Sequence, residues 1–232
     1  LSQFLKHSIP NIRKTQLNII PYIIFGMIIS ESCSSSDIAK VLKHSFSSIQ
    51  YDSVIKRIRR FFANPLFDPY IFYQYLILFV LNSFNSKHID KIIYITFDHM
   101  FSKHNYTVLM FTMRIGTFAI PLWFKCFKNY SDNEAFQFNI IQDGINTVSN
   151  LFNHSDFKLV FLADRWFGSP KILDTINSLG HTYCIRLKGN IIVYKDGNKF
   201  KAKNLKHRKF HSVIHNDVFI TDYRYKTNIV FS

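Results

Sequence analysis

Apolar residues in the first third of the chain recur at the spacing of amphipathic helices. A short helix is expected after the N-capping residues 34–37, and a second helix is expected from about Gln50 to Phe62. Their apolar faces hold Ile38, Val41 and Leu42 in the first helix, and Val54, Ile58, Phe61 and Phe62 in the second. Asp68-Pro69 supplies an N-cap and a first-turn proline for an apolar helix that reaches residue 84. Residues 1–87 are therefore predicted to be α-helical.

The stretch from Leu17 to Ile29 is the best candidate in the chain for a membrane segment. It is shorter than the roughly 20 residues that span a bilayer. Asn18, Pro21 and Gly26 also interrupt it. We therefore expect a kinked core helix here and no membrane partner.

The pattern changes near residue 90, where short runs rich in β-branched and aromatic residues replace the helical spacing. The expected elements are strands at 92–97, 106–115 and 118–127, a helix opened by the capping box at 131–134, a strand at 157–163, a helix beginning at 170 and a strand at 182–187. Gly116-Thr117 between the second and third strands is a tight turn, so the first three strands form an antiparallel meander. The order β-β-β-α-β-α-β predicts an α/β fold over residues 88–190.

The segment after Gly189 is expected to be rich in β-structure as far as residue 232. A hairpin is predicted around residues 196–198, and residues 218–225 alternate loosely between apolar and polar side chains. The segment is also basic, with Lys195, Lys199, Lys201, Lys203, Lys206, Arg208 and Lys209.

The formal net charge of +14 argues against a small-molecule substrate, because a globular domain that binds a small substrate rarely carries so much positive charge. A polyanionic partner explains the charge, since lysine and arginine displace counterions from phosphate backbones. The alternative is a codon bias toward lysine. The three widely spaced cysteines form neither a disulfide framework nor a zinc motif, which fits a cytoplasmic protein.

Asp98 and Asp164 share one context, because each directly follows a buried apolar strand. The carboxyl ends of parallel strands meet at one edge of a sheet, where α/β folds place their sites. If the two strands are parallel neighbours, both carboxylates point into one crevice and can bind two Mg²⁺ ions. The alternative for either residue is structural, since aspartate is common in turns and at helix N-caps.

Three segments resemble bacterial insertion-sequence transposases of the DDE class. Residues 94–99 (Tyr-Ile-Thr-Phe-Asp-His) resemble the strand that carries the first aspartate of that class. Residues 161–168 (Phe-Leu-Ala-Asp-Arg-Trp-Phe-Gly) resemble its second-aspartate motif, which is the more specific of the two. Residues 183–190 resemble the strand that follows. The resemblance covers roughly residues 30 to 190 and points to the insertion sequence 4-like group.

This resemblance implies an RNase H-like core, a mixed five-stranded sheet with helices, preceded by an α-helical DNA-binding region and followed by a β-strand insertion. It implies cleavage and strand transfer of double-stranded DNA, at element ends and target, with Mg²⁺ or Mn²⁺. Asp98 and Asp164 would be catalytic metal ligands. Self-association in the DNA complex is also expected.

The sequence departs from the family pattern at the third acid, which is a glutamate on a late helix. The only glutamates are Glu31 and Glu134, and neither follows Asp164. The chain starts at Leu1 and ends in an apolar run, so we expect a copy that is truncated inside the insertion and has little or no activity. Asp217 or Asp222 as a substitute acid is the less favoured explanation.

Basic residues gather at two places that suit DNA. Lys56, Arg57, Arg59 and Arg60 lie on the polar faces of the helix at 50–62, which pairs with the preceding short helix like a helix-turn-helix. The alternative is a solvated basic helix. Arg165, Arg186 and Lys188 lie near the expected crevice and are candidates to contact phosphates.

His99 is interpreted as a turn histidine, with orientation of a catalytic water as the alternative.

Two further functions compete with a transposase. The first is a non-catalytic DNA-binding or dimerising remnant that modulates a full-length transposase. The second is an unrelated RNase H-like nuclease, for which Asp143 or Asp174 would have to supply the third carboxylate. The nuclease ranks last, because both residues fall inside predicted helices.

Overall fold

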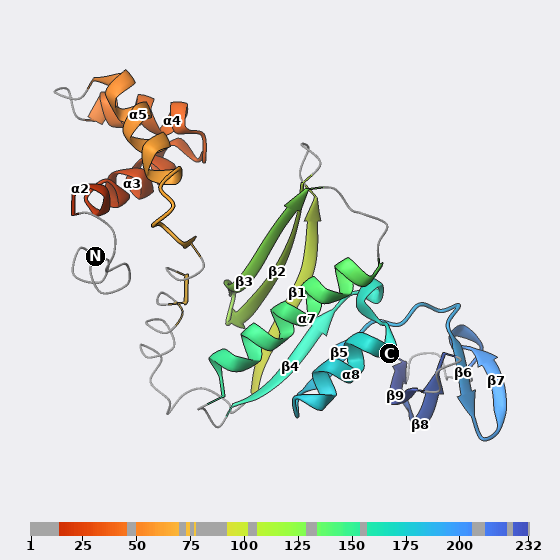
Figure 1. Ribbon diagram of the computed structural model, residues 1–232. Coiled ribbons are helices and arrows are strands. Elements are labelled where there is room, and N and C mark those ends of the chain that lie inside the picture. The colour runs from red at the N-terminus through yellow and green to blue at the C-terminus, as the bar shows by residue number, and fades with distance from the viewer. Residues whose placement is uncertain are drawn as a thin grey trace. The chain divides into compact units, whose positions relative to one another are not determined.

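The computed structural model describes residues 14–45, 50–69, 73–74, 77, 92–101, 106–128, 134–153, 157–205, 212–221 and 225–231. The chain divides into two compact units, Leu1–Asn85 and Ser86–Ser232 (Figure 1).

The N-terminal unit is helical. Its helices are α2 (Lys14–Leu17), α3 (Ile20–Ser30), α4 (Ser35–Ser45) and α5 (Tyr51–Phe62). They enclose a core that includes Ile23, Ile38, Leu42, Val54, Ile58 and Phe61. Helices α3 and α4 approach closely at Gly26, where a Cβ atom would lie 2.6 Å from Cγ2 of Ile38.

Helices α4 and α5 lie where the sequence predicts helices. The apolar stretch is interrupted at Asn18–Ile19, between α2 and α3, and a proline occupies the first turn of α3. The expected core helix is buried only in part, because Ile28 and Ile29 of α3 are 68% and 58% exposed. Phe62 is a correction: it is 57% exposed and contacts Phe61 edge-on, because it lies at the margin of the buried face that Val54, Ile58 and Phe61 form. Most of the helix predicted over residues 70–84 lies outside the described residues.

Among the helices described, none has the length and apolar character to cross a membrane.

The second unit is built around a five-stranded sheet of order β3-β2-β1-β4-β5. The strands are β1 (Ile92–Phe101), β2 (Tyr106–Ile115), β3 (Phe118–Lys128), β4 (Lys158–Ala163) and β5 (Thr182–Ile185). Strand β2 pairs antiparallel with β1 and β3, whereas β1, β4 and β5 are parallel. The predicted mixed five-stranded sheet is confirmed.

Two helices, α7 (Glu134–Leu151) and α8 (Pro170–Ser178), connect the strands and contact each other (Figure 1). Side chains of β1, β2 and β4 alternate between buried and more exposed positions, and Phe97, Phe111 and Phe161 are buried on the α7 side. Phe97 stacks on Phe111 with ring centroids 4.8 Å apart. Gly144 of α7 lies directly over Phe111, where a Cβ atom would come within 2.3 Å of the ring. The opposite face of these strands is more exposed, and it carries Tyr94 and Thr96.

A second sheet of order β7-β6-β8-β9 follows. Its strands are β6 (Ile192–Lys195), β7 (Asn198–Lys201), β8 (Val213–Ile220) and β9 (Tyr225–Phe231). The predicted hairpin is confirmed, with positive φ at Asp196 and Gly197. The strand predicted from Val218 is a correction, because β8 begins at Val213 and contains a bulge between His215 and Val218.

The second sheet is attached to the first through α8 and β5. Val193, Val218 and Ile220 are fully buried and pack with Leu173 of α8. Two side-chain hydrogen bonds join the same elements: Asn177 Nδ2 donates to the Tyr225 hydroxyl at 2.5 Å, and the hydroxyls of Tyr183 and Thr227 lie 2.8 Å apart. The inner face of this sheet is therefore occupied by α8 and β5.

The close approach at Gly144 gives a stability prediction. Gly144→Ala should lower the free energy of unfolding by about 1–3 kcal/mol, because a fully buried Phe111 cannot move away from the new methyl group. This loss exceeds the gain of at most about 1 kcal/mol in helix propensity. Gly189→Ala is the matched control, since its Cβ atom would make only a 3.4 Å contact with Lys203. Urea unfolding in which Gly144→Ala is as stable as the control would contradict the packing described.

Candidate active site

Asp98 lies in β1 on the more exposed face of the sheet. Its neighbour Phe97 points to the α7 side and is 2% exposed, so Asp98 points the other way. Asp98 pairs across to Met110 in β2, and two residues earlier the hydroxyls of Thr96 and Thr112 are hydrogen-bonded on the same face. The strand therefore holds the carboxylate in a fixed position at the surface.

Asp164 directly follows β4 and comes beside Asp98. Phe97 is the register partner of Ala163 in the parallel pair β1–β4, so the two aspartates occupy the next positions along neighbouring strands. Neighbouring strands lie about 4.8 Å apart. Asp164 also has an extended backbone, with φ −79° and ψ 177°, which continues the alternation of β4. Its side chain therefore emerges on the same face as Asp98.

Each carboxylate is oriented by a main-chain N–H. Oδ1 of Asp98 accepts a hydrogen bond from the His99 amide at 2.7 Å, and Oδ1 of Asp164 accepts one from the Trp166 amide at 2.7 Å. The second bond makes Asp164 the N-cap of the short helix η1 (Arg165–Phe167). Asp164 therefore has the structural role of a helix cap in addition to any role as a ligand. Within the described part of the chain neither carboxylate forms an ion pair. Oδ2 of each residue is therefore available to a ligand.

The two carboxylates suit a divalent metal ion in their chemistry but do not complete its site. Exposed carboxylate oxygens at neighbouring positions of two adjacent strands are hard donors of the kind that Mg²⁺ prefers. No cluster of three or more histidine, cysteine, aspartate or glutamate side chains forms among the described residues. The structure thus provides two acidic donors at this edge.

His99 is a correction to the sequence analysis, because it lies within β1 and not in a turn. Its imidazole contacts the rings of Trp166 and Phe167, with centroids 4.7 Å and 4.9 Å away. Burial lowers the pKa of His99, and the negative charges of Asp98 and Asp164 offset part of that shift. The electrostatic effect of both carboxylates on one ring agrees with their proximity.

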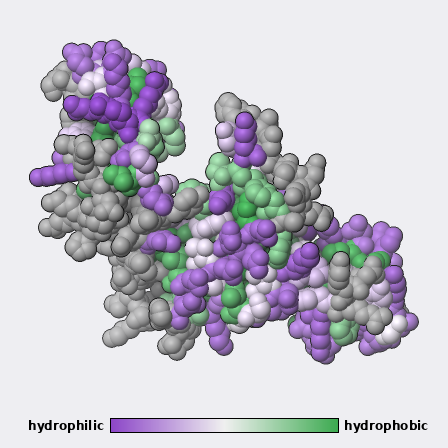
Figure 2. All heavy atoms as spheres, viewed as in Figure 1, coloured by the Kyte–Doolittle hydropathy of each residue, from purple (hydrophilic) through white to green (hydrophobic). Residues whose placement is uncertain are grey.

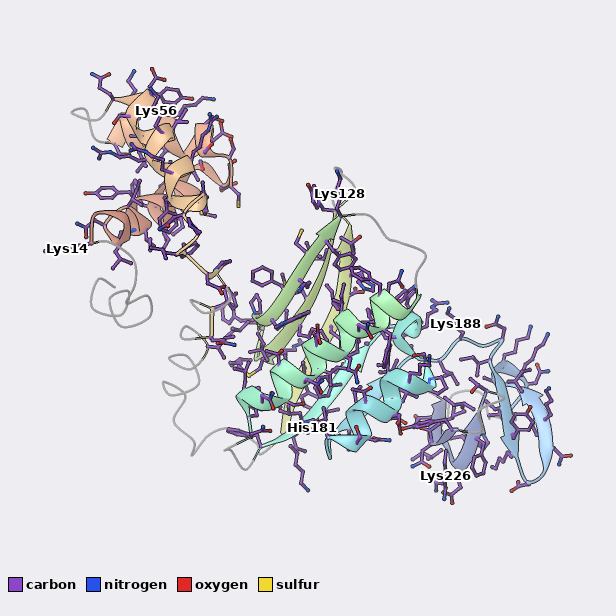
Figure 3. All side chains as sticks on the ribbon, viewed as in Figure 1. Lys14, Lys56, Lys128, His181, Lys188 and Lys226 are labelled. Carbon is purple, nitrogen blue, oxygen red and sulfur yellow. The ribbon has the colours of Figure 1, made fainter. Side chains whose placement is uncertain are left out.

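The structure brings Arg186 and Arg165 to the same edge. Arg186 follows β5, and its amide donates to the Ala163 carbonyl at 3.2 Å, so its position is next to Asp164. Arg165 directly follows Asp164 in η1, and both arginines are exposed. Lys188 is exposed on the segment between β5 and β6 (Figure 3). All three candidates are accessible to a phosphate backbone.

The remaining basic candidates belong to the N-terminal unit. Lys56, Arg57, Arg59 and Arg60 are exposed on α5, opposite the buried face formed by Val54, Ile58 and Phe61. The surface around this helix is mainly hydrophilic (Figure 2). Residues 46–49, between α4 and α5, lie outside the described residues, so the helix-turn-helix assignment remains a prediction.

Sequence reasoning missed the aromatic support behind the acid pair. Phe167 is fully buried, and its ring lies 4.7 Å from that of Phe97, which precedes Asp98. Trp166 is 41% exposed and contacts His99. The available signal was the pair of aromatic residues directly after Asp164-Arg165.

The fold and the acid pair define a mixed α/β domain with a candidate carboxylate site. A sequence model of the transposase DDE domain matches residues 114–229, half of the chain. This chain belongs to the transposase DDE domain family. The match contains Asp164, Arg165 and Arg186, whereas Asp98 precedes it.

Structural comparison found weak likeness to Argonaute from Marinitoga piezophila. The complex with 5′ OH guide RNA and target DNA is 20% identical over 61% of this chain and 23% of that chain, with a TM-score of 0.30. The complex with 5′ OH guide RNA is 17% identical over 78% of this chain and 29% of that chain, with a TM-score of 0.32. This chain thus spans less than a third of those chains. No relative was found among curated proteins.

The basic surface of α5 gives a binding prediction. Arg57→Gln/Arg60→Gln should weaken binding of the chain to duplex DNA and reduce the slope of log affinity against log salt by about 1.8, or about 0.9 for each lost phosphate contact. Lys40→Gln/Lys43→Gln on α4 removes the same charge from two exposed positions and serves as the control. Equal salt slopes for the two double variants, measured by fluorescence anisotropy, would rule out a specific role for α5.

Proposed function

We propose that this chain acts in DNA transposition, with Asp98 and Asp164 as two metal-binding acids that cleave and join phosphodiester bonds of double-stranded DNA at element ends and target. The observation that carries this proposal is the register of β1 and β4, which sets Asp98, within β1, beside Asp164, directly after β4, on one face. Membership of the transposase DDE domain family supports it.

The proposed chemistry needs divalent cations, Mg²⁺ or Mn²⁺, which activate the attacking oxygen and stabilise the leaving oxygen of a phosphodiester. Asp98 and Asp164 would bind them through Oδ2, while the amides of His99 and Trp166 hold each Oδ1 in place. Arg165 and Arg186 flank the pair and are suited to bidentate contact with a phosphate. These side chains bind and orient the substrate around the scissile bond.

We also propose the domain roles that the family resemblance implies. Residues 88–190 would be an RNase H-like core, which the order β3-β2-β1-β4-β5 with one antiparallel strand supports. Residues 1–87 would bind DNA through the basic helix α5, and residues 191–232 would begin a β-strand insertion. Self-association in the DNA complex follows from the need to hold two element ends together.

Metal binding tests the acid pair. Mn²⁺ titrated into the full chain by calorimetry should bind at least about tenfold more weakly to Asp98→Asn and to Asp164→Asn, because each change removes a charged donor. The fold should be kept, since Asp98 is exposed and asparagine at 164 can still cap η1. Asp174→Asn, an exposed change on α8, is the control. Unchanged Mn²⁺ affinity in either site variant would contradict the proposal that both aspartates are metal ligands.

The third acid limits the expected activity. Glutamate occurs only at positions 31 and 134, and neither follows Asp164. Asp217 lies in β8 and is paired with Lys226 at 2.9 Å, and Asp222 lies outside the described residues. Asp143 and Asp174 lie on helices α7 and α8, whereas Asp98 lies in β1 and Asp164 directly follows β4.

We therefore expect little or no nicking of element-end DNA by the 232-residue chain in Mg²⁺. A gel assay with supercoiled DNA that carries the element end measures this, with Asp98→Asn/Asp164→Asn as the blank. Robust nicking that the double variant abolishes would show that another residue completes the site. Absence of nicking together with tight duplex binding would favour the second function, a non-catalytic DNA-binding protein that modulates a complete transposase.

A further inference from the structure

The outer face of the second sheet carries a row of four side chains that crosses all four strands. Tyr194 of β6 is the register partner of Lys199 in β7 and of Phe219 in β8, and Phe219 is the partner of Lys226 in β9. Side chains at paired positions point to the same face of a sheet. Across the surface, the order of the four side chains is therefore Lys199, Tyr194, Phe219 and Lys226.

Among the described residues of this face, Lys199, Phe219 and Lys226 are exposed and Tyr194 is half-buried. Val193 and Ile220, which neighbour Tyr194 and Phe219 in sequence, are fully buried on the inner face against α8, so the row points away from the core. Phe219 is 38% exposed. Lys226 is exposed on β9 (Figure 3).

The charge of this segment suits a polyanion. Residues 188–232 contain eight lysines and two arginines against three aspartates, and no glutamate. Among the described residues, Asp217 forms an ion pair with a member of the row, Lys226, at 2.9 Å, and both side chains stay largely exposed. An exposed ion pair of this kind is weak, so a phosphate can replace the carboxylate.

The two aromatic rings suit bases more than a backbone. Tyr194 and Phe219 are on adjacent strands, about 4.8 Å apart, and offer two neighbouring stacking positions. Lys199 Nζ lies 5.6 Å from the centroid of the Tyr194 ring, an exposed cation–π contact that a stacked base and its phosphate can take over. Base faces are accessible only in unpaired strands, since stacking occupies them in a duplex.

We propose that this row, Lys199-Tyr194-Phe219-Lys226, is a binding platform for single-stranded DNA. The two rings stack on unpaired bases, and the flanking lysines contact the phosphates of the same strand. Single-strand binding by this row is separate from the proposed cleavage function. It requires neither a metal ion nor the two aspartates. The platform has a fixed place beside α8 and β5, because the inner face of its sheet is bonded to both.

The test is fluorescence anisotropy of the full chain with a labelled single strand of about 12 nucleotides, in EDTA, beside a duplex of equal length. Phe219→Leu should weaken single-strand binding about tenfold, because it removes the ring and keeps an apolar side chain. Phe219→Tyr keeps the ring and should bind within about twofold of the wild type. Duplex binding should be unchanged in both variants.

Two matched controls separate the platform from general effects. Val230→Ala truncates another exposed apolar side chain in β9 and should leave single-strand affinity unchanged. Lys199→Gln/Lys226→Gln should lower the salt slope of single-strand binding by about 1.4, at about 0.7 for each phosphate. Lys128→Gln/Lys158→Gln, which removes the same charge from the first sheet, should not lower it.

The proposal is overturned if Phe219→Leu binds single strands like the wild type, if Val230→Ala loses as much affinity, or if duplex binding falls in parallel. Circular dichroism and thermal melting show whether each variant is folded. If Phe219→Leu is not folded, the salt slope of Lys199→Gln/Lys226→Gln decides, and an unchanged slope overturns the proposal. Asp98→Asn/Asp164→Asn should bind single strands normally in EDTA. The platform proposal is thus tested by single-strand binding in EDTA, whereas the metal-binding proposal for Asp98 and Asp164 is tested by Mn²⁺ titration.

Discussion

The contact between Phe97 and Phe167 is the interaction on which the candidate site depends. Phe97 precedes the first acid, and Phe167 lies three residues after the second. Their rings meet at 4.7 Å on the buried side of the sheet, with Phe111 stacked behind Phe97. This packing fixes the turn after β4 against β1, and the register of the two strands then places Asp98 beside Asp164 on the other face. Buried aromatic packing thereby sets the geometry of two exposed carboxylates.

Much of the fold could be predicted from the sequence, because its local signals are strong. The β-branched runs gave the five strands, Gly116 gave the turn of the meander, and Asp196-Gly197 gave the hairpin. Each of these features depends on residues close together in the chain. The prediction that Asp98 and Asp164 share an edge required only that both strands be parallel neighbours, which the β-β-β-α-β order favours.

The errors arise where the signal depends on distant contacts or on a broken alternation. Asp217 has a positive φ of 54° and lies in the bulge of β8, so the alternation changes phase there and conceals the part of the strand from Val213. The sequence predicts that the first strand ends at Phe97, which makes His99 a turn residue, but β1 continues through Asp98 and His99 to Phe101 because it pairs with β2. The row across the second sheet combines residues from four strands, and no local pattern reveals it.

The two units and two sheets divide the positive charge of the chain among separate surfaces. Helix α5 carries four exposed basic residues, the acid pair is flanked by Arg165 and Arg186, and the second sheet holds lysines at both ends of its aromatic row. A transposase must hold duplex ends, position a scissile phosphate and accommodate strands that become unpaired. Three distinct sets of side chains agree with such a division of tasks.

The most direct test of the central claim is an anomalous difference map from crystals of this chain soaked in Mn²⁺. The account predicts a peak bonded to carboxylate oxygens of both Asp98 and Asp164, on the face of the sheet opposite Phe97 and Phe167. A peak bound to only one of the two aspartates, or manganese located only elsewhere in the molecule, would contradict the claim that their strands form one metal site.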